Sequence, residues 1–312
     1  MKKSILLFLI IISSELLFAQ QLPQFSLRAY DLMNYNPAVV GSNLNSEIRM
    51  HHRSQWVGFE NAPNSDILSY NASINKIGLG ASIYYDSEVI TKKIGVNLMY
   101  AYHIFCNKFN ISLGSNAGIQ QNQLSTSSLN PFDKNDPLLT SELAQTIWIP
   151  NVGGGIFIYN WNYYIGTSFT YYLPFQLSKG DYNKATQSFF YYAMGGYNFH
   201  LSDNFNLLAQ TFLSGQQNSN MQFEFGLKGL FIKVYSLGVS YRPNDAIVLS
   251  TSIKIYKSIL IAYSYDIVIS KLRNYNSGSH EIVISYEFDS NNSLYYKNEN
   301  RIKKKIYSDI NF

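Results

Sequence analysis

The sequence is poor in charge, and this scarcity already limits the classes of protein to which it can belong. Only 14% of its 312 residues are Asp, Glu, Lys or Arg, whereas soluble domains average about a quarter. Aromatic residues make up 16% of the chain, which argues against a disordered protein and against a helical cytosolic enzyme. No run of about 18 or more apolar residues follows the N-terminal stretch, so membrane-spanning helices are excluded as well. A large β protein remains, either soluble or embedded in a membrane.

Cysteine is almost absent, since Cys106 is the only one in the sequence. A single cysteine cannot form an intramolecular disulfide, which excludes a disulfide-stapled secreted module. Asn107 and Lys108 follow it, and this triplet is more typical of a tight turn between strands than of a reactive thiol. The excess of basic residues is also small, with a formal net charge of +4. The charge therefore predicts no nucleic-acid partner.

Residues 1–19 have the features of a secretory signal. Two lysines form a positive start, an apolar run covers residues 4–12, and Ala19 is the expected cleavage point. A membrane anchor is the alternative, but the apolar run is short and Glu15 interrupts the segment that follows it. We therefore expect an exported protein. It is not expected to be a lipoprotein, because no cysteine follows Ala19 directly.

The strongest pattern after the signal is an alternation of apolar and polar residues with period two, which is the period of a β-strand. From Ile94 to Ile104, for example, every second residue is Ile, Val, Leu or Tyr, and the residues between them include Gly95 and Asn97. Many of these segments are 9–13 residues long, close to the 9–11 residues with which a tilted strand crosses a bilayer. The pattern predicts fourteen strands, at 47–56, 66–74, 77–87, 93–105, 108–121, 146–158, 162–172, 188–199, 205–213, 221–230, 232–241, 246–255, 257–267 and 280–288.

The links between the predicted strands alternate in length. The links after even-numbered strands are short, such as Asn75-Lys76, whereas most links after odd-numbered strands are longer, such as 122–145 and 173–187. Bacterial outer-membrane barrels alternate short periplasmic turns with longer outer loops in this way. The sequence therefore predicts an all-β, antiparallel outer-membrane barrel over residues 47–288, with both termini in the periplasm.

The residues that alternate with the apolar ones would be costly against lipid, so they are expected to face the lumen. Small residues such as Gly78 and Gly80 would make room there for water, loops or a plug. Pro23 and Pro37 argue against a strand in residues 20–46, which we expect to be a periplasmic segment that could plug the lumen. Residues 289–312 follow the last strand as a basic tail, either simply solvated or a docking segment for a periplasmic partner. Its candidate docking residues are Arg301, Lys303, Lys304 and Lys305.

No catalytic, cofactor-binding or metal-binding constellation can be recognised. The five histidines fall on different predicted strands and turns, and His51 and His52 are adjacent in sequence, so they would point to opposite faces of one strand. His103 and His280 could both face the lumen, but no cysteine or carboxylate cluster gives the spacing of a metal site. The sequence therefore predicts a protein that is not an enzyme and has no cofactor.

Several segments resemble the PorP/SprF family of type IX secretion system membrane proteins. They are spread in the expected order over nearly the whole chain after the signal, which makes the set specific although each alone would be weak. In this sequence they start at Gln24-Phe25-Ser26, Asn34 to Gly41, Arg53 to Gly58, Ile77 to Asp86 and Gly95 to Ile104, and continue at Ser240 to Val248, Tyr263 to Asp266 and Ser277 to Ile282. The chain departs from the family pattern at Val39-Val40, at Asn64 and in its C-terminal tail.

The resemblance implies an outer-membrane barrel of the type IX secretion and gliding machinery that delivers or retains a secreted surface protein, such as an adhesin, without catalysis. It also implies contact with periplasmic components of the machinery. We expect the outer loops to bind the C-terminal region of the secreted protein. The alternative is a diffusion porin or a small-solute transporter, since these proteins share the barrel. The candidate partner-binding residues are Trp56, Phe59, Pro131, Phe132, Pro137, Tyr182, Arg273 and Tyr275.

Overall fold

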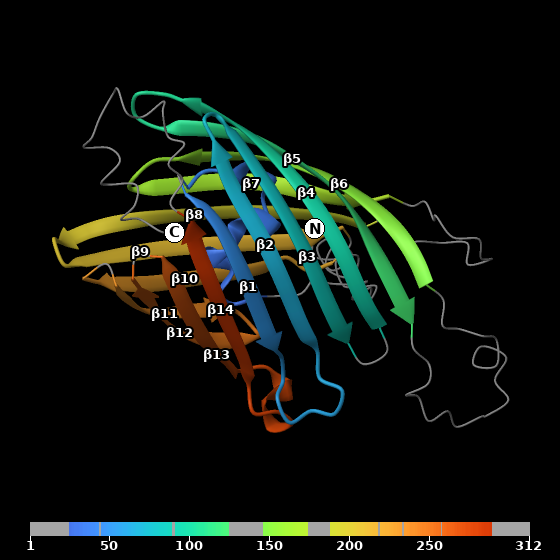
Figure 1. The fold of residues 1–312 in the computed structure, drawn as a ribbon. Helices are drawn as coiled ribbons and strands as arrows, with labels where there is room; N and C mark the ends of the chain where they lie inside the picture. The colour runs from blue at the N-terminus through green and yellow to red at the C-terminus, as the bar shows by residue number, and fades with distance from the viewer. Residues whose placement is uncertain are drawn as a thin grey trace, which may run out of the picture.

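The computed structural model describes residues 25–43, 45–88, 91–124, 146–173, 188–217, 219–232, 234–256 and 258–288. Within these ranges, fourteen antiparallel strands form a closed barrel in which each strand pairs with its neighbours in sequence and the first pairs with the last (Figure 1). The strands are β1 (Ser46–Ser54), β2 (Asn64–Ile74), β3 (Ile77–Glu88), β4 (Thr91–Phe105), β5 (Asn110–Leu124), β6 (Thr146–Tyr159), β7 (Tyr163–Tyr172), β8 (Ser188–Ser202), β9 (Phe205–Gln216), β10 (Gln222–Phe231), β11 (Tyr235–Arg242), β12 (Ala246–Ile255), β13 (Ile259–Val268) and β14 (Ser279–Phe288).

The strand alternation separates two environments, as the sequence predicts. On β4, Ile94 and Leu98 point outwards, and Leu98 is 63% exposed, whereas Gly95 and Ala101 on the other face are buried. On β10, Phe223 and Phe225 point outwards and Glu224 between them is buried inside the barrel. An apolar outer wall around a polar interior is the arrangement of outer-membrane barrels. The predicted all-β outer-membrane barrel of fourteen strands is therefore confirmed.

The observed strands extend beyond some of the predicted ends. β4 begins at Thr91 and β8 continues to Ser202, because hairpin pairing persists where the sequence has lost its apolar alternation. Glu88 still pairs with Thr91, for example, although both lie beyond the apolar run. Ser46 at the start of β1 pairs with Phe288 at the end of β14. The first residue of β1 and the last residue of β14 therefore lie at the same end of the barrel, which is the end that carries the short turns.

Helical structure in the described ranges is limited to short 3-10 turns. Three of them, η1 (Arg28–Tyr30), η2 (Leu32–Asn34) and η3 (Pro37–Val39), precede the barrel in sequence, and η4 (Lys271–Asn274) lies between β13 and β14. Across the part of the chain that is described, no helix has the length and apolar character needed to cross a membrane.

Candidate functional site

The segment that precedes β1 lies inside the barrel. We call residues 25–43 the lumenal segment; its 3-10 turns are the blue elements enclosed by the strands in Figure 1. Phe25, Leu27, Ala38 and Val40 are almost completely buried. This stretch cannot join the sheet, because Pro37 lacks a backbone donor and the Asn36 side chain accepts a hydrogen bond from the Ala38 amide at 3.0 Å to start η3. The chain therefore folds into compact turns that fill the lumen.

Glycines of the wall form a cradle for the backbone of this segment. An added Cβ would lie 1.9 Å from the Val40 carbonyl oxygen at Gly78, 2.2 Å from the Ala38 nitrogen at Gly114 and 2.1 Å from Asn36 Oδ1 at Gly155. No side chain can occupy such positions without displacing the segment. The expectation that small lumen-facing residues make room for something inside is confirmed, and the occupant is the protein's own N-terminal segment.

Hydrogen bonds fix the end of the lumenal segment that leads into β1. Asn36 donates to the carbonyl of Ile156 at 3.1 Å, and the amide of Gly41 donates to Asn71 Oδ1 at 2.8 Å. His103 Nε2 lies 2.8 Å from the Val40 carbonyl oxygen, and its Nδ1 lies 3.0 Å from the Tyr159 hydroxyl. His103 therefore positions the segment.

The expectation that His103 and His280 could both face the lumen is wrong for His280. His280 contacts Tyr263 and Tyr265 on the outward side of the wall. Its place in the strand explains the difference. It lies between the buried Ser279 and Glu281 on β14, so the alternation of the strand directs its side chain outwards.

A buried ionic cluster holds the other end of the lumenal segment, and Ser26 is at its centre. The Ser26 hydroxyl donates to Asp266 at 2.7 Å and accepts hydrogen bonds from Arg53 at 2.9 Å and Arg242 at 3.0 Å. One donated and two accepted hydrogen bonds use the full capacity of a hydroxyl group. Arg53 also bonds directly to Asp266 at 2.8 Å. The hydroxyl thus links strands β1, β11 and β13 to the segment.

Glu281 of β14 completes this side of the cluster. Its carboxylate accepts the backbone amides of Ser26 at 2.7 Å and Leu27 at 2.6 Å, together with Arg53 Nη1 at 2.7 Å. His51 Nε2 lies 2.5 Å from the same group. The side chain of Glu281 has no exposed surface, so its charge is compensated entirely by these neighbours.

Arginines alternate with carboxylates through the rest of the interior. Glu224 pairs with Arg28 of the lumenal segment and accepts two hydrogen bonds from Arg242, at 3.0 and 3.1 Å. The guanidinium of Arg28 also lies over the Phe212 ring, 4.5 Å from its centroid. Removing one member of a buried ion pair leaves an uncompensated charge and typically costs about 3–5 kcal/mol. The segment is therefore bound by groups that depend on one another.

A second group of charges binds the middle of the segment. Asp31 accepts hydrogen bonds from Arg49 at 3.1 Å and from Ser69 at 2.9 Å, and Arg49 also pairs with Glu47 at 2.5 Å. Asn34 donates to the same Asp31 carboxylate at 2.8 Å. The first two strands of the barrel are thus connected to the segment that precedes them.

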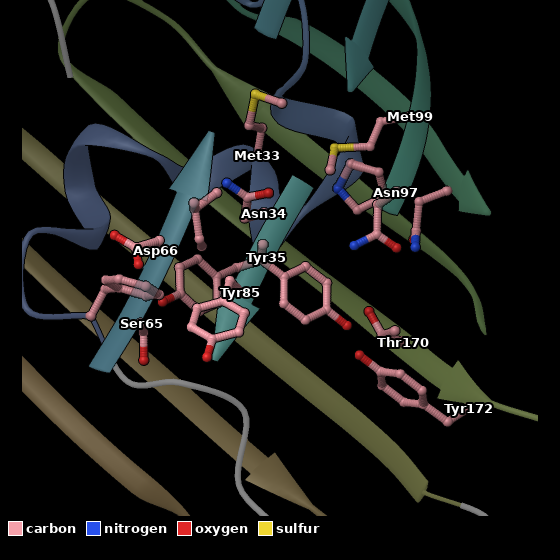
Figure 2. Close-up of a pocket in the computed structure, with 15 residues that line it drawn as sticks. Met33, Asn34, Tyr35, Ser65, Asp66, Tyr85, Asn97, Met99, Thr170 and Tyr172 are labelled. Carbon is pink, nitrogen blue, oxygen red and sulfur yellow. The ribbon is translucent and has the colours of Figure 1, made fainter. Parts of the chain in front are cut away.

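A cavity of about 60 Å³ lies between the lumenal segment and the wall. Figure 2 shows Met33 and Tyr35 of the segment on one side of it, with Asn97 and Met99 of β4 and Tyr172 of β7 around it. Burial raises the pKa of Tyr35 to about 12, so this phenol is neutral at physiological pH. The cavity is large enough for a few water molecules.

The chemistry of the interior is that of a site that holds a peptide. Among the described residues, no group of three or more His, Cys, Asp and Glu side chains is arranged to hold a metal ion. The carboxylates of Glu224, Asp266 and Glu281 face arginines. These groups neutralise and hydrogen-bond one another around the backbone and hydroxyl of Ser26.

Two of the outer links predicted to bind a partner are joined by the structure. The Val57 amide donates to the Gly278 carbonyl at 2.8 Å, and the Ser277 amide donates to the Val57 carbonyl at 2.7 Å. We call the links 55–63 and 269–278 together the lip. The lip contains four of the predicted residues, of which Phe59 is 47% and Tyr275 is 70% exposed. These four residues are Trp56, Phe59, Arg273 and Tyr275.

The remaining predicted site residues lie outside the described ranges. Four belong to the two long outer links and four to the C-terminal tail, and the signal and residues 20–24 also fall outside. The residues concerned are Pro131, Phe132, Pro137, Tyr182, Arg301, Lys303, Lys304 and Lys305.

The ionic cluster was not predicted from the sequence, although the segments that carry the family resemblance contain most of its members. Each of five such segments contributes one residue to the cluster, and these residues are more than 200 positions apart at the extremes. One signal was present in the sequence. Charged residues occupy strand positions whose side chains face the lumen, although the chain has few charges overall. The residues are Ser26, Arg53, Arg242, Asp266 and Glu281.

The chain is similar to several known proteins. A family model described as "Type IX secretion system membrane protein PorP/SprF" matches residues 17–286. Among solved structures, the toluene transporter TbuX of Ralstonia pickettii superposes with a TM-score of 0.50 at 13% identity, covering 82% of this chain and 92% of that one. The outer membrane protein Omp33 of Acinetobacter baumannii gives 0.47 at 8% identity, covering 80% and 100%. These two likenesses concern the fold alone. None of the curated proteins matches the sequence.

Proposed function

Because the chain belongs to the PorP/SprF family of type IX secretion system membrane proteins, we propose that it binds a secreted surface protein, such as an adhesin, and delivers or anchors it at the outer membrane. The fold of an outer-membrane barrel provides the membrane-embedded part of this role. The proposed role is non-catalytic: no bond is made or broken, and no cofactor is needed.

The observation that carries this proposal is the occupied lumen. The lumenal segment is buried along its length and attached to the wall at both of its ends, by Glu281 and Arg53 at one and by His103 at the other. A lumen that is filled by the protein's own chain blocks diffusion through the barrel. The same filling makes the barrel wall rigid, which suits a scaffold for another protein. A rigid wall can then present binding loops at a fixed geometry.

The lip is the described surface that best suits the secreted partner. Phe59 and Tyr275 are exposed, large and aromatic, and Arg273 lies two residues before Tyr275 in sequence. Aromatic and arginine side chains dominate the binding energy of protein interfaces. We propose that this surface contacts the C-terminal region of the secreted protein, together with the outer links that carry Pro131, Phe132, Pro137 and Tyr182.

The short turns would then face the periplasm, with both termini on that side, and residues 1–19 would be removed as a signal. Outer-membrane barrels place their short turns in the periplasm, and the chain enters and leaves the wall at the short-turn end. The tail residues Arg301, Lys303, Lys304 and Lys305 would lie near the periplasmic components of the machinery. Adding a protease-cleavable tag after residue 312 tests this side assignment, since cleavage in intact cells would contradict it.

A paired substitution in the lip tests the proposed partner contact. Phe59→Ser with Tyr275→Ser is expected to lower the amount of the secreted protein retained at the cell surface at least fivefold, while the barrel still assembles. Phe169→Ser with Tyr197→Ser is the matched control, because both side chains are exposed aromatics of the outer wall, away from the lip. Unchanged retention in the lip variant, with secretion still dependent on the protein itself, would contradict the lip assignment.

A diffusion porin or small-solute transporter is the alternative function. A porin requires a continuous path, and the lumenal segment occupies the place where that path would run, whereas a transporter can have a plugged lumen. Conductance of the purified full chain in planar bilayers distinguishes the porin from the anchoring role. Large and stable channels would favour the porin, and a silent bilayer would favour the anchoring role.

A further inference from the structure

The cavity beside the lumenal segment lies towards the end of the barrel that is opposite the short turns. Ser65, the second residue of β2, and Tyr172, the last residue of β7, both line it. Met33 and Tyr35 of the lumenal segment form its other side (Figure 2). The cavity is therefore placed to receive a group that approaches from the side of the long links.

The volume of the cavity limits its occupant to a small group. The cavity has a volume of about 60 Å³, whereas an engineered cavity of about 150 Å³ in another protein binds benzene. A complete aromatic or sugar ring is therefore too large for it. The end of one side chain, with a few heavy atoms, is of the right size.

The lining of the cavity favours a neutral occupant. Among the described residues that line it, Asp66 alone carries a charge, and its carboxylate lies 2.7 Å from His52 Nδ1. Tyr35 is neutral as well, because burial raises the pKa of its hydroxyl to about 12. A cation or an anion would lose its hydration here and would gain no counter-charge.

Part of the lining is apolar. Phe25, Met33 and Met99 line the cavity, and all three are buried. Methionine side chains are flexible and adapt to the shape of what they contact. The occupant that gains most from this part of the lining has aliphatic carbon next to its polar end.

Three polar atoms of the lining residues have no hydrogen-bond partner within the described ranges. They are the Tyr35 hydroxyl, Asn97 Oδ1 and Asn116 Oδ1. Buried polar groups are normally hydrogen-bonded, and an unpaired one is costly. The two amide oxygens can only accept a hydrogen bond, whereas the neutral phenol can donate one. The complement of this set is a group with two donor hydrogens and one acceptor.

A primary carboxamide is such a group. Its NH₂ supplies two donors, and its carbonyl oxygen is an acceptor. The acetamido group of an N-acetylated sugar has only one N–H, so it would leave one of the two asparagine oxygens unpaired. Among protein side chains, Asn and Gln carry a primary carboxamide on aliphatic carbon.

We propose that this cavity binds the carboxamide of an Asn or Gln side chain from a protein segment that approaches from the long-link side. The NH₂ group would donate to Asn97 Oδ1 and Asn116 Oδ1, and the carbonyl oxygen would accept from the Tyr35 hydroxyl. The aliphatic carbons would lie against Met33 and Met99. The identification of this segment as part of the secreted surface protein rests on the proposed function, whereas the carboxamide site itself does not.

The first experiment measures the binding of acetamide to the purified full-length protein in lipid nanodiscs by saturation-transfer NMR, which suits the weak binding of small fragments. Acetate and acetone are the comparison ligands, because acetate has the same shape with a charge and acetone has the carbonyl without N–H donors. Acetamide is expected to give a signal at least tenfold stronger than either analogue. A cavity that holds only water would give no acetamide signal, and this result would overturn the proposal.

Two substitutions test the assigned contacts. Asn97→Leu removes one acceptor at nearly constant volume and should weaken acetamide binding at least tenfold. Tyr35→Phe removes the donor but keeps the ring, and it should weaken binding severalfold. Asn198→Leu is the matched control, because Asn198 also lies on the inward face of a strand but near the short turns. Native binding in both cavity variants would overturn the proposal.

Competition experiments distinguish a protein side chain from a sugar. Glycyl-glutamine is expected to displace acetamide from the native protein, whereas glycyl-glutamate and N-acetylglucosamine are not. Glycyl-glutamate tests the charge at constant shape, and N-acetylglucosamine tests the secondary amide. Displacement by N-acetylglucosamine alone would overturn the assignment to an Asn or Gln side chain.

Retention of the secreted protein in intact cells tests where the carboxamide comes from. Asn97→Leu is expected to lower this retention at least fivefold, and Asn198→Leu should leave it unchanged. Normal retention in Asn97→Leu, while retention still depends on the barrel, would contradict the assignment to the secreted protein. A failure of the proposed function looks different, because retention would then not depend on the barrel at all. Acetamide binding by the purified protein would still support the carboxamide site in that case.

Discussion

The hydroxyl of Ser26 donates to the carboxylate of Asp266 at 2.7 Å, although 240 positions separate the two residues. The same hydroxyl accepts from Arg53 and Arg242. A single small side chain at the start of the lumenal segment thus connects three strands of the wall. The interior of the barrel is organised around this contact.

Ser26→Ala is expected to destabilise the protein by about 1–3 kcal/mol, because the substitution removes three buried hydrogen bonds to charged groups. The midpoint of urea unfolding in lipid vesicles should fall accordingly. Ser250→Ala is the matched control, since Ser250 also lies on the inward face of a strand but outside the cluster. Equal midpoints for the two variants would contradict the role assigned to Ser26.

Glu281→Gln should have a larger effect, about 3–5 kcal/mol, because it removes one partner of a buried ion pair and leaves Arg53 partly uncompensated. The amide also has only one carbonyl oxygen for the donors that now share two carboxylate oxygens. Urea unfolding measures the loss of stability. Glu60→Gln, at an exposed position of the lip, should change the midpoint by less than about 0.5 kcal/mol.

Gly78→Ala is expected to displace the lumenal segment from the wall, since the new Cβ would lie 1.9 Å from the Val40 carbonyl oxygen. Hydrogen exchange at the amide of Gly41, which bonds to Asn71, should become faster by at least tenfold. Gly195→Ala is the control, because its nearest neighbour would be 3.6 Å from the added Cβ. Native exchange in Gly78→Ala would show that the cradle is not needed.

Alkaline pH should weaken the protein through Tyr35. Burial raises the pKa of this phenol to about 12 from an ordinary value of 10.0, so the folded state keeps the proton in a range where the unfolded state loses it. The stabilisation is complete below pH 10 and is lost as the pH rises towards 12, by about 1.4 kcal/mol for each unit. In the Tyr35→Phe variant, the free energy of unfolding should therefore fall less between pH 9 and pH 11 than in the native protein. Tyr100→Phe on the exposed wall should not show this difference.

The wall of the barrel could be predicted from the sequence because a lipid-facing strand repeats one rule at every second residue. Ile94, Leu98 and Phe223 obey that rule and point outwards. Strand ends were less well predicted, as at Thr91 and Ser202, because the pairing of a hairpin continues after the contact with lipid has ended.

The interior could not be predicted in the same way, because its contacts join residues with no regular spacing. In the sequence, Glu281 is simply one of the polar residues of the last strand. Only the closure of the barrel brings its carboxylate to the amides of Ser26 and Leu27. His103 was predicted to face the lumen, but its partner, the Val40 carbonyl, is a backbone atom that no side-chain pattern reveals. The segments of the family resemblance marked these residues without indicating that they meet.

The pairing of β1 with β14 has a consequence for the order of assembly. The lumenal segment comes first in the chain, yet its contacts with Glu281 span 254 and 255 positions and need the last strand. Contacts so distant in sequence form late, after most of the loop-closure entropy has been lost. The lumenal segment therefore gains its full set of contacts only when the seam between Ser46 and Phe288 closes. A barrel that closed without this segment would leave Arg53 and Glu281 facing an empty interior.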